Sequence, residues 1–484
     1  MNGGRRSRAP VAWTMASQVV SHCFSILGGM AALALPVILL AAAGVTLAWR
    51  PALALPSFAV QTGQPCAACH VGAFGPQLTQ YGRDFKLYGY VSAAPGKQAF
   101  LPLSVADQLT FTHTQKNQPP GAVFAPRFST NDNISPLQEL SLFYAGAIIP
   151  KQLGGFVEVH YEASDSTISL SNMDIRHSQE AHILGEDAVW GVTFNNSPTV
   201  QDLWNSSPGW GFPYFSSAVA PTPAANSLLD QTSHNSYGLG VYGLWNDLLY
   251  GEFDLYREPA KSTIQALGQP ISNISVAEGF SPYWRAALQH SFDKDHHYLQ
   301  IGTYGLVQNL RPGGDSSTGH TDHYVDTAFD ANYQWYADPN DVRAPVLSTH
   351  ATFIHEAEDL DASSILTGAN AHNHLNTFRV DASYAIDATY TPTLQYFTKS
   401  GSADASGFWG TGADGNAVVS PDSAGWVVEL AYVPWGKPDS PFGNMNGRLI
   451  LQYTDYTKFN GASRHATDNN TLMLMVHLAF GLPK

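Results

Sequence analysis

The feature that most restricts the fold of this chain is a regular alternation of apolar and polar residues, which runs from about residue 104 onward. In one segment Phe378 and Val380 share one parity, whereas Arg379 and Asp381 share the other. Successive side chains of a β-strand point to opposite faces, so the pattern predicts strands with one apolar face. Carboxylates on the opposite face require water. Strands of this kind are typical of an outer-membrane barrel with lipid outside and a wet lumen inside.

The pattern occurs about sixteen times, and the intervening connections alternate in length, as in single-chain outer-membrane barrels. Residues 150–152 form a short turn, for example, whereas residues 195–235 form a long loop. One connection departs from this rule, because the long stretch 435–446 falls where a short turn is due. The expected strands begin near residues 104, 136, 153, 168, 184, 236, 247, 282, 296, 321, 343, 374, 387, 424, 447 and 469.

Composition favours the same class of fold. Charged residues make up only 13% of the 484 residues, about half the share in soluble globular proteins. Aromatic residues reach 12%. A soluble β-sandwich or propeller is the alternative, but the chain has no repeat of fixed period. The net charge of −15 argues against nucleic acid as a partner and is compatible with binding cations.

The N-terminal region predicts export from the cytoplasm. Arg5, Arg6 and Arg8 precede an apolar stretch over residues 26–49, and Ala52-Leu53-Ala54 follows as a small-x-small cleavage pattern. We interpret residues 1–54 as a signal peptide. The alternative is an uncleaved anchor, since the apolar stretch is long enough to span a bilayer. Either reading places the rest of the chain beyond the inner membrane.

The strongest chemical motif is Cys66-Ala67-Ala68-Cys69-His70, the attachment pattern for c-type haem. Each thiol would form a thioether with one haem vinyl group, and His70 would bind the iron as an axial ligand. A zinc site needs further ligands, and the only other cysteine, Cys23, lies in the signal region. A redox dithiol would need a βαβ context, which the sequence does not show. The expected cofactor is therefore one covalent haem c.

We therefore predict a mainly β fold, an outer-membrane antiparallel β-barrel of about sixteen strands over residues 101–484, preceded by a small α-helical haem plug over residues 55–100. A short helix is expected over residues 82–90. The plug is too small to bury much core alone.

The sixth iron ligand is not evident in the plug, because residues 55–96 contain no methionine and no histidine besides His70. Either the iron has an open position or a barrel residue closes it. The candidates are lumen-facing residues, which could equally line the lumen without touching iron: Met473, Met475, His477 and His160.

The chain resembles the fused outer-membrane cytochrome–porins of iron-oxidising bacteria. The resemblance covers nearly the whole chain and rests on the haem motif after the signal, on Leu78-Thr79 and Gly82-Arg83, and on the segments 198–205 and 210–213. It implies a porin-like barrel of about sixteen strands with the haem segment in or below its lumen. In members that oxidise iron, Phe-Pro-x-Leu-Thr follows the haem histidine directly, whereas here Gly75 precedes the proline, as in a related subgroup.

The resemblance implies an outer-membrane electron conduit. An extracellular donor, Fe(II) in this family, would reduce the haem, and a periplasmic c-type cytochrome would accept the electron. This activity would make the chain an Fe(II):cytochrome c oxidoreductase. The inserted Gly75 leaves a different donor, or outward electron flow, as an alternative. A third hypothesis is a transport porin in which the haem is structural or sensory.

Overall fold

A computed structural model describes residues 56–94, 102–118, 131–163, 166–198, 200–231, 236–268, 275–412, 416–441 and 445–481. The chain divides into two units, residues 1–51 and residues 52–484. The first unit and the whole predicted signal peptide lie outside the described residues, so the signal remains a prediction.

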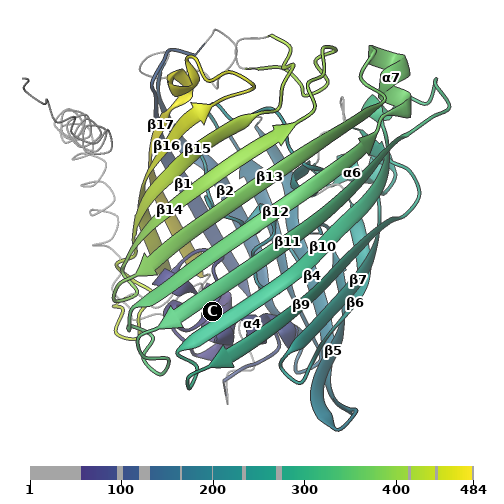
Figure 1. The fold of residues 1–484 in the computed structure, drawn as a ribbon. Coiled ribbons are helices and arrows are strands. Elements are labelled where there is room, and N and C mark those ends of the chain that lie inside the picture. The colour runs from purple at the N-terminus through teal and green to yellow at the C-terminus, as the bar shows by residue number, and fades with distance from the viewer. Residues whose placement is uncertain are drawn as a thin grey trace, which may run out of the picture. The chain divides into compact units, whose positions relative to one another are not determined.

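Sixteen antiparallel strands close into a barrel (Figure 1), which confirms the predicted fold class. The barrel closes because β1 pairs with both β2 and β17. A two-residue strand, β8 (Val276–Ala277), pairs with β10 beside β9. The barrel strands are β1 (Leu103–Thr114), β2 (Asp132–Ile149), β3 (Leu153–Glu162), β4 (Thr167–Ile183), β5 (Glu186–Asn195), β6 (Tyr237–Trp245), β7 (Leu249–Arg257), β9 (Ser281–Phe292), β10 (His297–Arg311), β11 (Asp322–Tyr336), β12 (Val346–Asp359), β13 (His372–Ala385), β14 (Tyr390–Gly401), β15 (Ser423–Tyr432), β16 (Met445–Lys458) and β17 (Thr471–Gly481).

Burial alternates along the strands as the sequence pattern predicts. In β7 every second residue is exposed, including Leu249 and Phe253, whereas Tyr250 and Asp254 between them are buried. Apolar side chains therefore cover the outside, and polar side chains point inward, as expected of a barrel whose outer surface contacts lipid.

The short turns have a local cause. Asn246 and Asp247 connect β6 to β7, and both have a positive φ, at 53° and 48°. Two consecutive positive φ values match the right-handed twist of paired strands, and Asn and Asp tolerate this conformation well. The sequence therefore specifies a tight hairpin at this end of the barrel.

The N-terminal segment forms a small helical plug, residues 56–94, at the short-turn end of the barrel (Figure 1). The predicted helix over residues 82–90 is α4, which begins two residues earlier because the side chain of Thr79 accepts a hydrogen bond from Gly82 N and caps it. It ends before Gly89, whose φ of 70° stops the helix. The plug helices are α2 (Pro56–Thr62), α3 (Cys66–Cys69), η1 (Val71–Ala73) and α4 (Gln80–Leu87).

The remaining helices belong to the loops. They are η2 (Pro208–Trp210), α5 (Leu228–Gln231), α6 (Lys261–Ala266), η3 (Pro312–Gly314), α7 (Asp361–Thr367) and η4 (Ala466–Asn469). Among the helices that the structure describes, none is sufficiently long and apolar to cross a bilayer.

The connection between β5 and β6 folds into the lumen instead of projecting outward. We call its described residues, 196–198 and 200–231, the inner loop. Its backbone oxygens accept hydrogen bonds from strands on several sides of the barrel: Ser216 O from Gln138 in β2, and Phe215 O from Gln452 in β16. The plug and the inner loop together occupy the lumen, so lumen-facing side chains are buried in spite of their polarity.

Candidate functional site

The predicted haem-binding residues lie on one short helical turn. Cys66 and Cys69 begin and end α3, and residues three apart in a helix share a face. His70 follows in an extended conformation, and its backbone N donates to Cys66 O at 2.9 Å. The two thiols are not joined by a disulfide. The three side chains are thus held together by the local fold.

All three residues line one cavity. The cavity and its opening to solvent together contain about 1260 Å³ of space free of protein atoms. It lies between the plug, the inner loop and the barrel wall. The aromatic residues in its walls are Phe58, Phe74, Phe85, Tyr90, Phe143, Phe156, Trp210 and Phe215. A large apolar cavity beside two cysteines and a histidine suits a flat aromatic macrocycle.

The imidazole of His70 has one nitrogen available for a ligand. Its Nδ1 is buried and has no hydrogen-bond partner among the described residues, and the residue lines the cavity. Burial lowers the pKa of His70 to about 4; the Gly75 backbone opposes this shift, and Arg448 adds to it. His70 is therefore neutral at physiological pH, the form that binds metals.

The cysteines do not resemble a redox dithiol. Burial, together with the neighbouring Cys66, raises the pKa of Cys69 to about 12. A reactive dithiol needs a lowered pKa, because the thiolate is the nucleophile. The electrostatics of the site therefore disfavour the dithiol alternative.

Two glycines allow the backbone to pack closely around Cys69 and His70. A Cβ at Gly82 would lie 2.3 Å from Cys69 O, so α4 packs directly on the haem motif. Gly75 has a φ of 97°, and its backbone faces Arg448. This conformation is accessible mainly to glycine. The inserted Gly75 thus forms a specific turn beside His70.

The plug is anchored to the inner loop and the barrel by buried hydrogen bonds. Lys86 Nζ donates to Val200 O, Asp202 O and Asn205 Oδ1 at 2.6–2.7 Å. Tyr90 Oη donates to Asp174 in β4 at 2.6 Å. These contacts hold the cavity in place relative to the barrel.

The unusually long connection after β15 also contacts the plug. Gly436 O accepts a hydrogen bond from Ala67 N at 3.0 Å. In the adjacent strand, Asn446 Nδ2 donates to Cys66 Sγ at 3.2 Å and to Ala73 O at 2.8 Å. The departure from the short-turn rule therefore has a structural reason, because this connection supports the haem motif.

The structure places the sixth-ligand candidates on the lumen side but not in the cavity wall. Met473 and Met475 are buried, at 1% and 0% exposure, and Met473 lines a separate cavity beside the inner loop. The ring of His477 packs against Phe74 and Phe215, with centroid distances of 4.8 and 5.0 Å. None of these three lines the cavity beside Cys66, Cys69 and His70, and its described lining contains neither methionine nor a second histidine. Their role as ligands stays a prediction.

His160 lies elsewhere on the lumen wall, where it faces Glu139 and Glu158. Glu158 stands two residues before His160 on β3 and so shares its face, whereas Glu139 comes from the neighbouring strand, where the sequence alone does not reveal it. Nor does the sequence reveal the contacts of Lys86 and Asn446, because their partners are 114 to 119 and 373 to 380 residues away. No local signal marks such contacts.

No protein-family model matches the chain, and no curated protein sequence matches it. Among solved structures, OmpF of Salmonella typhi in complex with daunomycin is similar, with 14% identity, a TM-score of 0.43, and coverage of 78% of this chain and 96% of that chain. The anion-selective porin from Comamonas acidovorans has 12% identity and a TM-score of 0.41, over 78% and 98%. OprB of Pseudomonas putida has 12% identity and a TM-score of 0.43, over 78% and 93%. At this level of identity, the chain is similar to these proteins in fold alone.

Proposed function

We propose that the cavity holds one haem c, which Cys66 and Cys69 would attach through thioethers and whose iron His70 would bind. The observation that carries the proposal is the convergence of these three side chains on a single large apolar cavity. When bound, haem supplies reversible one-electron exchange. Gly82 lets α4 close the site, Asn446 orients Cys66, and the aromatic walls exclude water.

We further propose that the barrel spans the outer membrane and holds this haem inside it. The support is the closed barrel itself, with apolar side chains outside and polar side chains inside. Because the barrel is closed, no strand edge leaves a row of unpaired backbone N–H and C=O groups, and a lipid environment requires this pairing. The plug lies at the short-turn end, which is the periplasmic end in barrels of this kind. The haem would thus be close to a soluble periplasmic partner.

On this basis the protein is an electron conduit that accepts an electron from extracellular Fe(II) and passes it to a periplasmic c-type cytochrome. The donor rests on the resemblance to cytochrome–porins of iron-oxidising bacteria and on the net charge of −15, which favours a cationic substrate. In this role the chain is an Fe(II):cytochrome c oxidoreductase.

Stopped-flow spectroscopy on the purified protein tests this function. We expect Fe(II) to convert the haem spectrum to its reduced form, and a c-type cytochrome to reoxidise it. In intact outer-membrane vesicles, a donor that cannot enter should reduce the haem from outside. Absence of reduction by Fe(II) at every pH at which Fe(II) is stable would rule out the ferrous substrate. Reduction only from the periplasmic side would rule out the inward conduit.

The size of the barrel favours a second candidate, a transport porin with a structural haem. Barrels of sixteen strands are wide enough for an aqueous channel. A liposome-swelling assay separates the two functions. A porin predicts solute flux that persists in Cys66→Ala, whereas the conduit predicts that this variant loses electron transfer and that flux through the filled lumen is low.

A further inference from the structure

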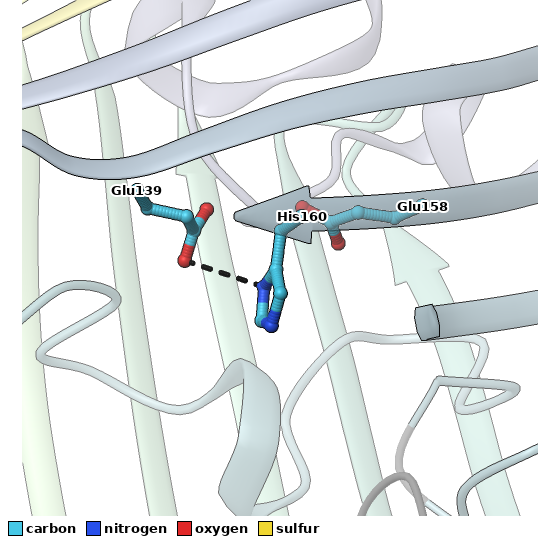
Figure 2. Close-up of side chains that lie close together, drawn as sticks. All are labelled: Glu139, Glu158 and His160. Carbon is cyan, nitrogen blue, oxygen red and sulfur yellow. Dashed lines mark ion pairs between the residues drawn. The ribbon is translucent and has the colours of Figure 1, made fainter. Parts of the chain in front are cut away.

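Outside the haem cavity, Glu139, Glu158 and His160 bring three potential metal ligands together on the lumen wall (Figure 2). Glu139 comes from β2, whereas Glu158 and His160 stand two residues apart on β3 and so share its lumen face. Their ligand atoms all lie within 4.8 Å of one another. His160 Nδ1 is 3.8 Å from Glu139 Oε2. We call these three residues the lumen triad.

The carboxylates of the lumen triad are held by neutral donors. Glu158 accepts hydrogen bonds from Ser141 Oγ at 2.7 Å and from Asn172 Nδ2 at 2.8 Å. Glu139 accepts one from Gln108 Nε2 at 2.9 Å. Donors of this kind orient metal-binding carboxylates in known sites.

Among the described residues, no lysine or arginine balances the negative charge of the lumen triad, and the ion pair that Glu139 forms is with His160. Across the described residues, neither glutamate forms an ion pair with lysine or arginine. The side chain of Glu139 is only 27% exposed and that of His160 only 13%, and Glu158 is buried. Two partly buried carboxylates without a cationic partner repel each other. A divalent cation would balance their two charges.

We propose that the lumen triad binds a divalent first-row transition metal ion, and that Fe²⁺ binds there as the substrate. The proposal rests on the function proposed above and names its substrate-binding site. Two carboxylate oxygens and one imidazole nitrogen suit Fe²⁺ or Mn²⁺, since these ions accept both oxygen and nitrogen ligands. Three protein ligands leave further positions for water.

The site lies next to the haem cavity. Phe143 lines that cavity and is the direct cross-strand partner of Glu158. Side chains in this relation have Cβ atoms about 5 Å apart. His160 follows two residues further along β3, on the side away from the short turn at residues 150–152. His160 therefore lies on the long-loop side of Phe143.

This position allows a direct electron transfer. An Fe²⁺ held by the lumen triad would give up one electron and become Fe³⁺, and a haem held by Cys66, Cys69 and His70 would accept that electron. No proton or other reactant is needed to balance the step.

Metal binding is measured apart from haem reduction, on detergent-solubilised holoprotein titrated anaerobically with Mn²⁺. Electron paramagnetic resonance reports free Mn²⁺. We expect His160→Gln and Glu158→Gln each to weaken Mn²⁺ binding by at least about tenfold. Two variants serve as matched controls. His350→Gln removes a lumen histidine of equal exposure, 13%, from another strand, and Glu162→Gln removes a nearby negative charge without removing a member of the lumen triad. Both should retain most of the affinity.

The outcomes separate the site from the function. If Fe(II) reduces the haem but His160→Gln and Glu158→Gln bind Mn²⁺ as the wild type does, the site is wrong and the conduit stands. If these variants lose Mn²⁺ but Fe(II) never reduces the wild-type haem, the site stands and the ferrous substrate is wrong. If Glu162→Gln weakens binding as much as Glu158→Gln, the effect is general electrostatics and the proposed coordination is refuted. The haem spectrum shows whether a variant is folded. If either His160→Gln or Glu158→Gln fails to fold, the other variant still tests the site.

Discussion

Replacement of Lys86 by methionine should destabilise the protein more than any exposed lysine substitution. Lys86 is 5% exposed, and its ammonium group donates three hydrogen bonds of 2.6 to 2.7 Å to the inner loop. Methionine has a similar length but donates none of them. Val200 O and Asp202 O would then lie buried without this donor, and the half-buried Asn205 Oδ1 would also lose it.

The size of the expected loss of stability follows from the burial of Lys86. A hydrogen bond to a charged group contributes about 1.5–3 kcal/mol, but methionine also removes the cost of burying the charge. We therefore expect a net loss of about 1–3 kcal/mol, the cost of leaving buried acceptors without a donor. The control is Lys116→Met. Lys116 forms one ion pair, with Asp468 at 3.0 Å, and its side chain is 66% exposed. Exposed pairs contribute about 0–1 kcal/mol.

Guanidinium denaturation in detergent at pH 6, followed by tryptophan fluorescence, measures both variants. Trp210 of the inner loop is a local reporter, because Lys86 Nζ lies 5.9 Å from its ring centre. Protease cleavage within residues 200–205 should also become faster in Lys86→Met. Equal denaturation midpoints for Lys86→Met and Lys116→Met would refute the view that Lys86 fastens the inner loop to the plug.

Three further results are expected. Gly82→Ala places a Cβ 2.3 Å from Cys69 O, and the resulting strain of about 1–3 kcal/mol should outweigh the gain in helix propensity of about 1 kcal/mol. The haem content per protein should therefore fall. The control Gly251→Ala, with open space around the glycine, should retain the haem content of the wild type. Gly75→Ala forces a φ of 97° on an L-residue and should alter the haem absorption spectrum, since Gly75 contacts His70; an unchanged spectrum would mean that this turn does not position the imidazole. Burial lowers the pKa of Lys86 to about 7, so between pH 7 and about 10.5 the unfolded chain binds more protons than the folded chain. The stability of the wild type relative to Lys86→Met should therefore rise with pH in this range. If the two denaturation midpoints differ by the same amount at pH 7 and at pH 9.5, the lowered pKa is contradicted.

The sequence by itself determined the barrel and the haem motif, because both depend on local patterns. Alternation with a period of two decides which face of a strand points outward, and this holds for Leu249 and Tyr250 whatever surrounds them. The motif Cys66–His70 needs only one helical turn to bring its three side chains together. For the same reason, the alternation predicted that the side chains of Met473, Met475 and His477 point into the lumen.

Only the tertiary structure decided which lumen residues meet. Parity places His160 and His477 inside the barrel, but His160 faces Glu139 across a strand pair, while His477 packs between Phe74 of the plug and Phe215 of the inner loop. The wall of the haem cavity likewise combines the plug with Trp210 and Asn446. These contacts join segments that are up to hundreds of residues apart, and they depend on how the plug and inner loop pack inside the closed barrel. A period of two carries no information about that packing.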